Sequence, residues 1–167
     1  MGEAPDPIEG EAAASPLQPV EPGYRNVLRL RLALLWIPVI FGAVLLDRAL
    51  EGSVFHWLPT LGVPLLALVS LATVPQRVHA RLAYGLTDRW LRVVRGWLFH
   101  TDTIVPLVRV QHIDVRRGPA EKLFGVATLV VHTAGTHNSI VTVPGLSPER
   151  AAEIRDVIRE HVRTDFQ

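Results

Sequence analysis

The chain has no cysteine at all and only one lysine, Lys122. Without cysteine there can be no disulfide framework, no thiolate zinc site and no cysteine nucleophile. The formal net charge is only +1, so there is no strong general field to attract nucleic acid. A basic face interleaved with aromatic residues is also missing, and we therefore expect no nucleic-acid partner.

The motifs of catalysis and cofactor binding are also missing. The chain has no glycine-rich phosphate loop, and Ser139 and Ser147 lack the neighbours that activate a nucleophile. His132 and His137 fall on one predicted hairpin, but a metal site needs three or four ligands and no carboxylate is well placed to join them. The sequence therefore predicts no enzyme activity, no cofactor and no metal.

Two long apolar runs dominate the first half of the chain. Leu32–Leu46 contains no charged residue, and Val54–Val74 has His56 as its only ionisable group. A helix needs roughly 20 apolar residues to cross a bilayer, which the second run supplies and the first reaches when extended back to Leu28. We expect a two-helix transmembrane hairpin over residues 25–75, joined by a short link at Asp47–Ser53. A buried helical hairpin in a soluble protein is the alternative.

Charge around these runs predicts their orientation. The flanking arginines are Arg25, Arg29 and Arg31 before the first run and Arg77 and Arg81 after the second. The link contains only Arg48, beside Asp47 and Glu51. Because cytoplasmic flanks carry the excess of basic residues, both termini are expected in the cytoplasm.

Residues 1–24 form an acidic, proline-rich segment, which has no basic residue through Glu21. Its acidic residues are Glu3, Asp6, Glu9, Glu11 and Glu21. Such a segment buries too little apolar surface to offset its chain entropy. We therefore predict a disordered, solvated tail, and an acidic tether for a basic partner is the alternative.

Residues 76–167 change to the short alternating pattern of strands. The predicted strands are Arg81–Thr87, Trp90–Arg95, Trp97–Val105, Val108–Val115, Val126–Thr133 and Ser139–Val143. A slip in alternation between Val110 and Ile113 indicates a bulge, and Pro144-Gly145 is expected to end the sheet. One helical turn is predicted at Ala120–Phe124.

An amphipathic helix closes the chain. Ser147 is a suitable N-cap, with Pro148 at the first helical position. Apolar residues then recur at helical spacing, among them Ala151, Ile154 and Ile158. This stripe is expected to cover an open end or face of the sheet, which gives an α+β plan or a small barrel.

Three stretches resemble the bacterial pleckstrin-homology (PH) domain, and more narrowly the small YdbS-like membrane proteins. They are YGLTDRWLRVVRGWLFHTDTIVPLVRVQHIDV, KLFGVATLVVHTAG and VPGLSPERAAEIRDVI. The resemblance covers Leu28–Val162. It implies a membrane-anchored α+β fold, in which an antiparallel PH-like barrel or sandwich is capped by the C-terminal helix.

The resemblance also implies a non-enzymatic interaction protein of the bacterial inner membrane. Such domains are associated with self-assembly or with other PH-domain membrane proteins. The phosphoinositide mode of eukaryotic PH domains needs a basic loop between the first two strands. Here that loop offers only Arg89 beside Asp88.

Two groups of basic residues are candidate contact sites. The first comprises Arg77, Arg81, Arg89, Arg92 and Arg95, as possible contacts to the membrane or its lipid headgroups. The second comprises Arg109, Arg116, Arg117 and Lys122, as possible contacts to a partner or a headgroup. The alternatives are topology determinants for Arg77 and Arg81, a solvated strand face for Arg89, Arg92 and Arg95, and ordinary surface charge for the second group.

Overall fold

The computed structural model describes residues 16–50, 57–97, 99–134 and 140–164. The described chain divides into two compact units. One is Arg25–Arg77, and the other combines the residues before Arg25 with those after Arg77. Most of the acidic segment, the link after Leu50, and residues 135–139 with His137 lie outside the described residues.

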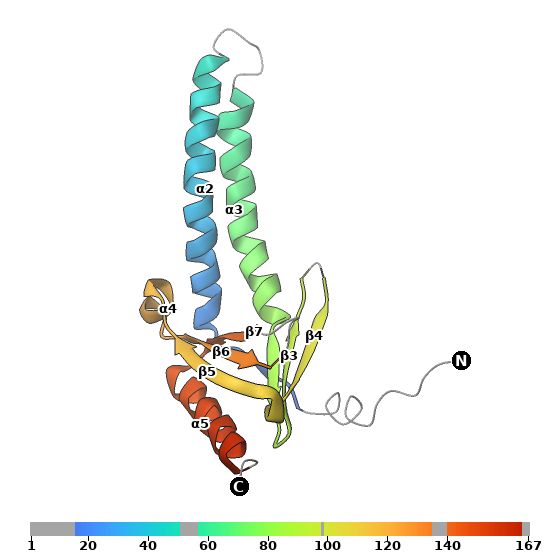
Figure 1. Cartoon of the computed structure of the whole chain (residues 1–167). Coiled ribbons are helices and arrows are strands. Elements are labelled where there is room, and N and C mark those ends of the chain that lie inside the picture. The colour runs from blue at the N-terminus through green and yellow to red at the C-terminus, as the bar shows by residue number, and fades with distance from the viewer. Residues whose placement is uncertain (1–15, 51–56, 98, 135–139, 165–167) are drawn as a thin grey trace, which may run out of the picture. The chain divides into compact units, whose positions relative to one another are not determined.

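The first unit consists of two long apolar helices that run side by side (Figure 1). They belong to α2 (Gly23–Ala49) and α3 (Trp57–Ala80), and each is long and apolar enough to cross a bilayer. Trp36 Nε1 donates a hydrogen bond of 2.7 Å to Ser70 Oγ, which joins the two helices. Apolar side chains such as Leu35 and Leu68 remain exposed, as expected of surfaces that face lipid.

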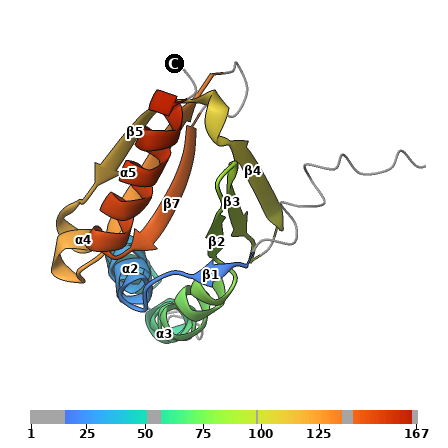
Figure 2. The ribbon, with the colours of Figure 1, turned by 90° about the horizontal axis from the view of Figure 1, so that it is seen from below.

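The second unit is built on two antiparallel sheets, seen from below in Figure 2. The first has the order β1-β2-β3-β4 and the second the order β5-β6-β7. The strands of the first are β1 (Gln18–Pro19), β2 (Ala83–Leu86), β3 (Trp90–Arg95) and β4 (Thr101–Pro106). Those of the second are β5 (Val110–Arg116), β6 (Ala127–Thr133) and β7 (Ile140–Leu146). A short 3₁₀ turn, η1 (Leu107–Arg109), connects the two sheets.

Helix α5 (Pro148–Thr164) packs on the second sheet (Figure 2). Ser147 Oγ accepts a hydrogen bond from the Arg150 N–H, which confirms the predicted cap. Ile154 and Ile158 are fully buried, as are Leu129 of β6 and Leu91 of β3. One apolar core thus fills the space between the sheets and α5, and the predicted PH-like fold with its C-terminal helix is confirmed.

Other local predictions are confirmed. The register between β5 and β6 shifts between Val110 and His112, where a bulge was predicted. The predicted helical turn is α4 (Pro119–Leu123). The Gly118 N–H donates a hydrogen bond of 2.6 Å to the Glu121 carboxylate, which closes this turn.

The end of the predicted disordered tail is instead part of the second unit. Gln18 pairs with Tyr84 and Pro19 with Ala83, so β1 extends the first sheet. Val20 and Tyr24 are buried, and the Glu21 N–H donates a hydrogen bond of 2.7 Å to the Gly145 carbonyl of β7. Residues 16–24 therefore differ from the prediction, because a few buried side chains and sheet hydrogen bonds offset their chain entropy.

Three predicted boundaries were wrong. Helix α3 continues through Pro75 to Ala80, because a proline inside an apolar helix is tolerated. The strand predicted to start at Trp97 starts at Thr101, since β3 ends before Gly96 and the described residues Trp97, Phe99 and His100 lie outside both strands. Strand β7 runs through Pro144-Gly145 to Leu146, because an irregularity between Ala127 and Thr128 lets Pro144 pair with Thr128.

Candidate interaction site

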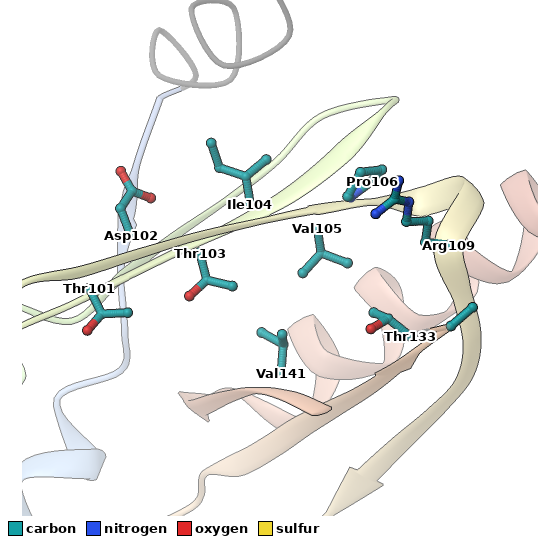
Figure 3. Close-up of a pocket in the computed structure, with 10 residues that line it drawn as sticks. Thr101, Asp102, Thr103, Ile104, Val105, Pro106, Arg109, Thr133 and Val141 are labelled. Atoms are coloured by element: carbon teal, nitrogen blue, oxygen red, sulfur yellow. The ribbon is translucent and has the colours of Figure 1, made fainter. Parts of the chain in front are cut away.

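A groove lies beside the outermost strand of the first sheet. Strand β4 pairs only with β3 among the described strands, so its other edge is open. Thr101, Thr103 and Val105 point from β4 across the groove toward Val141 and Thr133 of the second sheet (Figure 3). The groove measures about 410 Å³. Its walls combine hydroxyl and aliphatic groups beside unpaired backbone.

Two arginines of β3 hold the strands that border this groove. Arg92 Nε donates a hydrogen bond of 3.0 Å to the Asp102 carboxylate of β4. Arg95 reaches the second sheet and donates to the Thr142 carbonyl and, at 3.0 Å, to Thr142 Oγ1 of β7. Both guanidinium groups are therefore engaged inside the domain, and Arg95 ties the two sheets together.

The Arg92–Asp102 pair predicts a pH-dependent contribution to stability. The hydrogen bond from Arg92 holds the pKa of the Asp102 carboxyl below its usual value of 3.8. Because the pKa of Asp102 is lower in the folded state than in the unfolded state, its ionised form stabilises the fold at any pH above the unfolded-state pKa. This stabilisation is lost as the pH falls through the folded-state pKa. Because Asp102 is partly exposed, we expect Asp102→Asn to cost no more than about 1 kcal/mol at pH 7. Thermal unfolding of both proteins at pH 7 and at acid pH should show the difference disappear in acid; a constant difference would contradict this assignment.

The remaining arginines of the first group are dispersed. Arg77 is the last residue of the helical unit, and Arg81 Nη1 donates a hydrogen bond of 3.2 Å to the Trp97 carbonyl. Arg89 is exposed in the turn between β2 and β3. The structure thus does not gather Arg81, Arg89, Arg92 and Arg95 into one basic surface, and Arg77 belongs to the other unit.

The second basic group is also divided. Arg109 lines the groove before β5 begins, whereas Arg116 ends β5 and precedes Arg117. The seven residues of β5 separate these positions by about 20 Å. Arg116 Nη2 lies 3.5 Å from Asp114 Oδ2. Lys122 lies on α4, which follows the Arg116 end of β5 in the chain.

The histidines do not form a metal centre within the described residues. His112 Nε2 lies 2.9 Å from Asp114 Oδ1, and the rings of His112 and His132 lie 5.7 Å apart. Although partial desolvation opposes it, the hydrogen bond with His112 and the Arg116 charge lower the pKa of Asp114. The His112–Asp114 contact lies within β5, whereas the contact between the two histidine rings joins β5 to β6. The absence of a metal in the whole chain stays a prediction, since His137 is not described.

The groove residues were not predicted from the sequence. Thr101, Thr103 and Val105 were assigned only to a strand, because alternation indicates a strand without indicating whether its edge is covered. Val141 joins them through the packing of the two sheets. No local signal marks these positions as one surface.

Comparison with known proteins agrees with this architecture. The family described as "Bacterial PH domain" matches residues 32–162, most of the chain. The chain is 32% identical over 126 residues to UPF0699 transmembrane protein YdbS of Bacillus subtilis (strain 168), which covers 72% of this chain and 77% of the relative. No solved structure matches it significantly. Two apolar helices, paired antiparallel sheets, a closing helix and these matches together show that the chain belongs to the bacterial PH-domain family and resembles its YdbS-like transmembrane proteins.

Proposed function

We propose that this protein is a non-enzymatic, membrane-anchored interaction module of the bacterial inner membrane. Its domain lies on the cytoplasmic face and assembles with itself or with a companion PH-domain membrane protein. The observation that carries the proposal is the open edge of β4 beside the groove. Unpaired strand edges bind an added strand through backbone hydrogen bonds, and a neighbouring groove selects its side chains.

The anchor is proposed to cross the membrane twice. Strand β1 precedes the first apolar helix in the chain, and its partner β2 follows the second. Two residues that share a sheet must be on the same side of a membrane, so the helices between them have to cross an even number of times. The arginine-rich flanks favour the cytoplasmic side.

Assembly through β4 predicts that a cationic side chain in the groove separates the subunits. Thr103 is half-buried on β4 and faces the groove (Figure 3). Thr103→Lys would place an ammonium group beside the arriving strand, and natural edge strands use lysine to prevent such pairing. We expect the protein in mild detergent to shift from a larger species to a monomer, as measured by size-exclusion chromatography with light scattering.

Thr128→Lys is the matched control. Thr128 is also a half-buried threonine in a strand, but β6 is paired on both sides. We expect this variant to keep the size of the unchanged protein. A wild-type protein that runs as a clean monomer without a co-purifying protein would refute the proposal, as would equal sizes for Thr103→Lys and wild type.

Headgroup sensing by the arginines alone is the second candidate, and it has weaker support. Arg92 and Arg95 already bond to groups of the domain, and Arg109 lies far from Arg116. Only exposed side chains such as Arg89 and Arg117 remain available for a headgroup. Salt-sensitive dependence of assembly or binding on anionic lipid would favour this candidate over the open edge.

A further inference from the structure

We propose that the domain rests on the bilayer surface through two apolar contact points. The first consists of Trp97 and Phe99, which lie between β3 and β4, and the second is Leu123 at the end of α4. Phe99 is 83% exposed and Leu123 is 71% exposed. The inference rests on the two-crossing topology proposed above, and it adds a lipid-facing surface to it.

The first contact point lies next to the residues that follow the second apolar helix. The Arg81 side chain donates a hydrogen bond of 3.2 Å to the Trp97 carbonyl. Ala80 and Arg81 also face Gly96, Trp97 and His100 across a shared hollow. Since the helical unit ends at Arg77, this contact point is fixed only a few residues from the place where the chain leaves the membrane.

The second contact point lies next to the residues that lead into the first apolar helix. A Cβ atom on Gly23 would approach the Phe124 carbonyl oxygen to 2.5 Å, so the backbone after α4 touches Gly23. The helical unit begins only two residues later, at Arg25. Leu123 is therefore held close to the other place where the chain enters the membrane.

The two attachment regions are bound to each other within the domain. His79 Nε2 lies 3.1 Å from the carbonyl oxygens of Val20 and Glu21. The Glu21 N–H in turn bonds to Gly145. The sheets thus hold both contact points in fixed positions beside the two chain connections, and on the proposed two-crossing topology these connections lead directly into the membrane.

The side chains suit the interface between lipid and water. Tryptophan and other aromatic residues concentrate at this depth, and leucine beside cations is typical of segments that lie on anionic membranes. Arg81 flanks the first point, and Arg117 and Lys122 flank the second. A protein interface would need roughly 800 Å² from each partner, whereas a bilayer accommodates small separate points. The bilayer therefore fits this surface better than a second protein.

The absence of cysteine from the 167-residue chain allows a direct test without removing any part of it. Single-cysteine variants Phe99→Cys, Leu123→Cys and Val108→Cys would be labelled with an environment-sensitive fluorophore and reconstituted into vesicles containing anionic lipid. Val108 is the matched control, because it is apolar, 72% exposed, and lies beyond the opposite end of β4 from Phe99. Quenching is then compared between lipids carrying a nitroxide near the headgroup and iodide in the water.

We expect the labels at Phe99 and Leu123 to be quenched by the nitroxide lipid several-fold more than the label at Val108. The label at Val108 should be quenched mainly by iodide. Equal quenching at all three positions would overturn the inference. Protection of positions 99 and 123 from both quenchers would also overturn it, since it would indicate that a protein covers them.

The topology is measured separately with the same approach. In intact cells a membrane-impermeant maleimide should label Ser53→Cys in the link and leave Val108→Cys unlabelled until the cells are opened. If this holds while the quenching result fails, only the lipid-facing surface is wrong. If both positions react from the same side, the two-crossing topology fails, and the inference fails with it.

Discussion

Gly145→Ala is expected to destabilise the domain strongly. Gly145 has φ of +78°, which costs a residue with a side chain about 1–2 kcal/mol. A Cβ atom there would also lie 2.7 Å from Tyr24 Cβ, and Tyr24 is buried. Overpacking of this kind costs typically about 1–3 kcal/mol, so the two effects together remove a large part of the stability of a small domain.

Two glycines serve as matched controls. Gly125 has φ of +65° but open space around its Cβ position, so Gly125→Ala should show the backbone cost alone. Gly42 lies within α2 with no neighbour inside 4 Å, and Gly42→Ala should be neutral or slightly stabilising. Thermal unfolding in detergent can be monitored by near-ultraviolet circular dichroism. The midpoint temperature should be highest for Gly42→Ala, lower for Gly125→Ala and lowest for Gly145→Ala. A Gly145→Ala midpoint equal to that of Gly125→Ala would show that Tyr24 does not pack on Gly145.

Long or periodic elements could be predicted from the sequence. The two apolar helices need only length and hydropathy, so their existence follows directly from Leu32–Leu46 and Val54–Val74. The apolar stripe of α5 and the β-branched run of β6 were also clear. In each case the signal is repeated over many neighbouring residues.

Strand β1 could not be predicted, because its causes are far away in the chain. It has only two residues, Gln18 and Pro19, in a segment rich in acidic residues and proline. Its partners Tyr84 and Ala83 follow both apolar helices. Pairing over such a separation leaves no local pattern to read.

The basic residues show a second limit of sequence reasoning. Charge alone did not separate Arg95, which bonds to Thr142 of the other sheet, from Arg117, which is exposed. That distinction depends on strand register and on how the sheets face each other. Trp97 and Phe99 were likewise assigned to a strand, and only the start of β4 at Thr101 reveals their exposure.

Pairing between β1 and β2 can be tested by an engineered disulfide, which we expect to form readily if the two strands are paired and not at all if they are apart. Pro19 and Ala83 lie directly opposite each other in the antiparallel ladder. Opposite residues have Cα atoms about 4.5–5.5 Å apart, which falls inside the range that a disulfide bridges. Because the chain has no cysteine of its own, Pro19→Cys with Ala83→Cys would form the only possible intramolecular bridge.

The measurement uses native membranes and a protease site inserted in the link after Leu50. After oxidation and cleavage, the two halves of the chain should remain joined and separate only on reduction. Pro19→Cys with Val108→Cys is the control pair and should not join them. If the Pro19 and Ala83 pair also fails to join the halves, and the cysteine at position 19 reacts from the opposite side of the membrane, then the residues before the first helix are not part of the domain after the second.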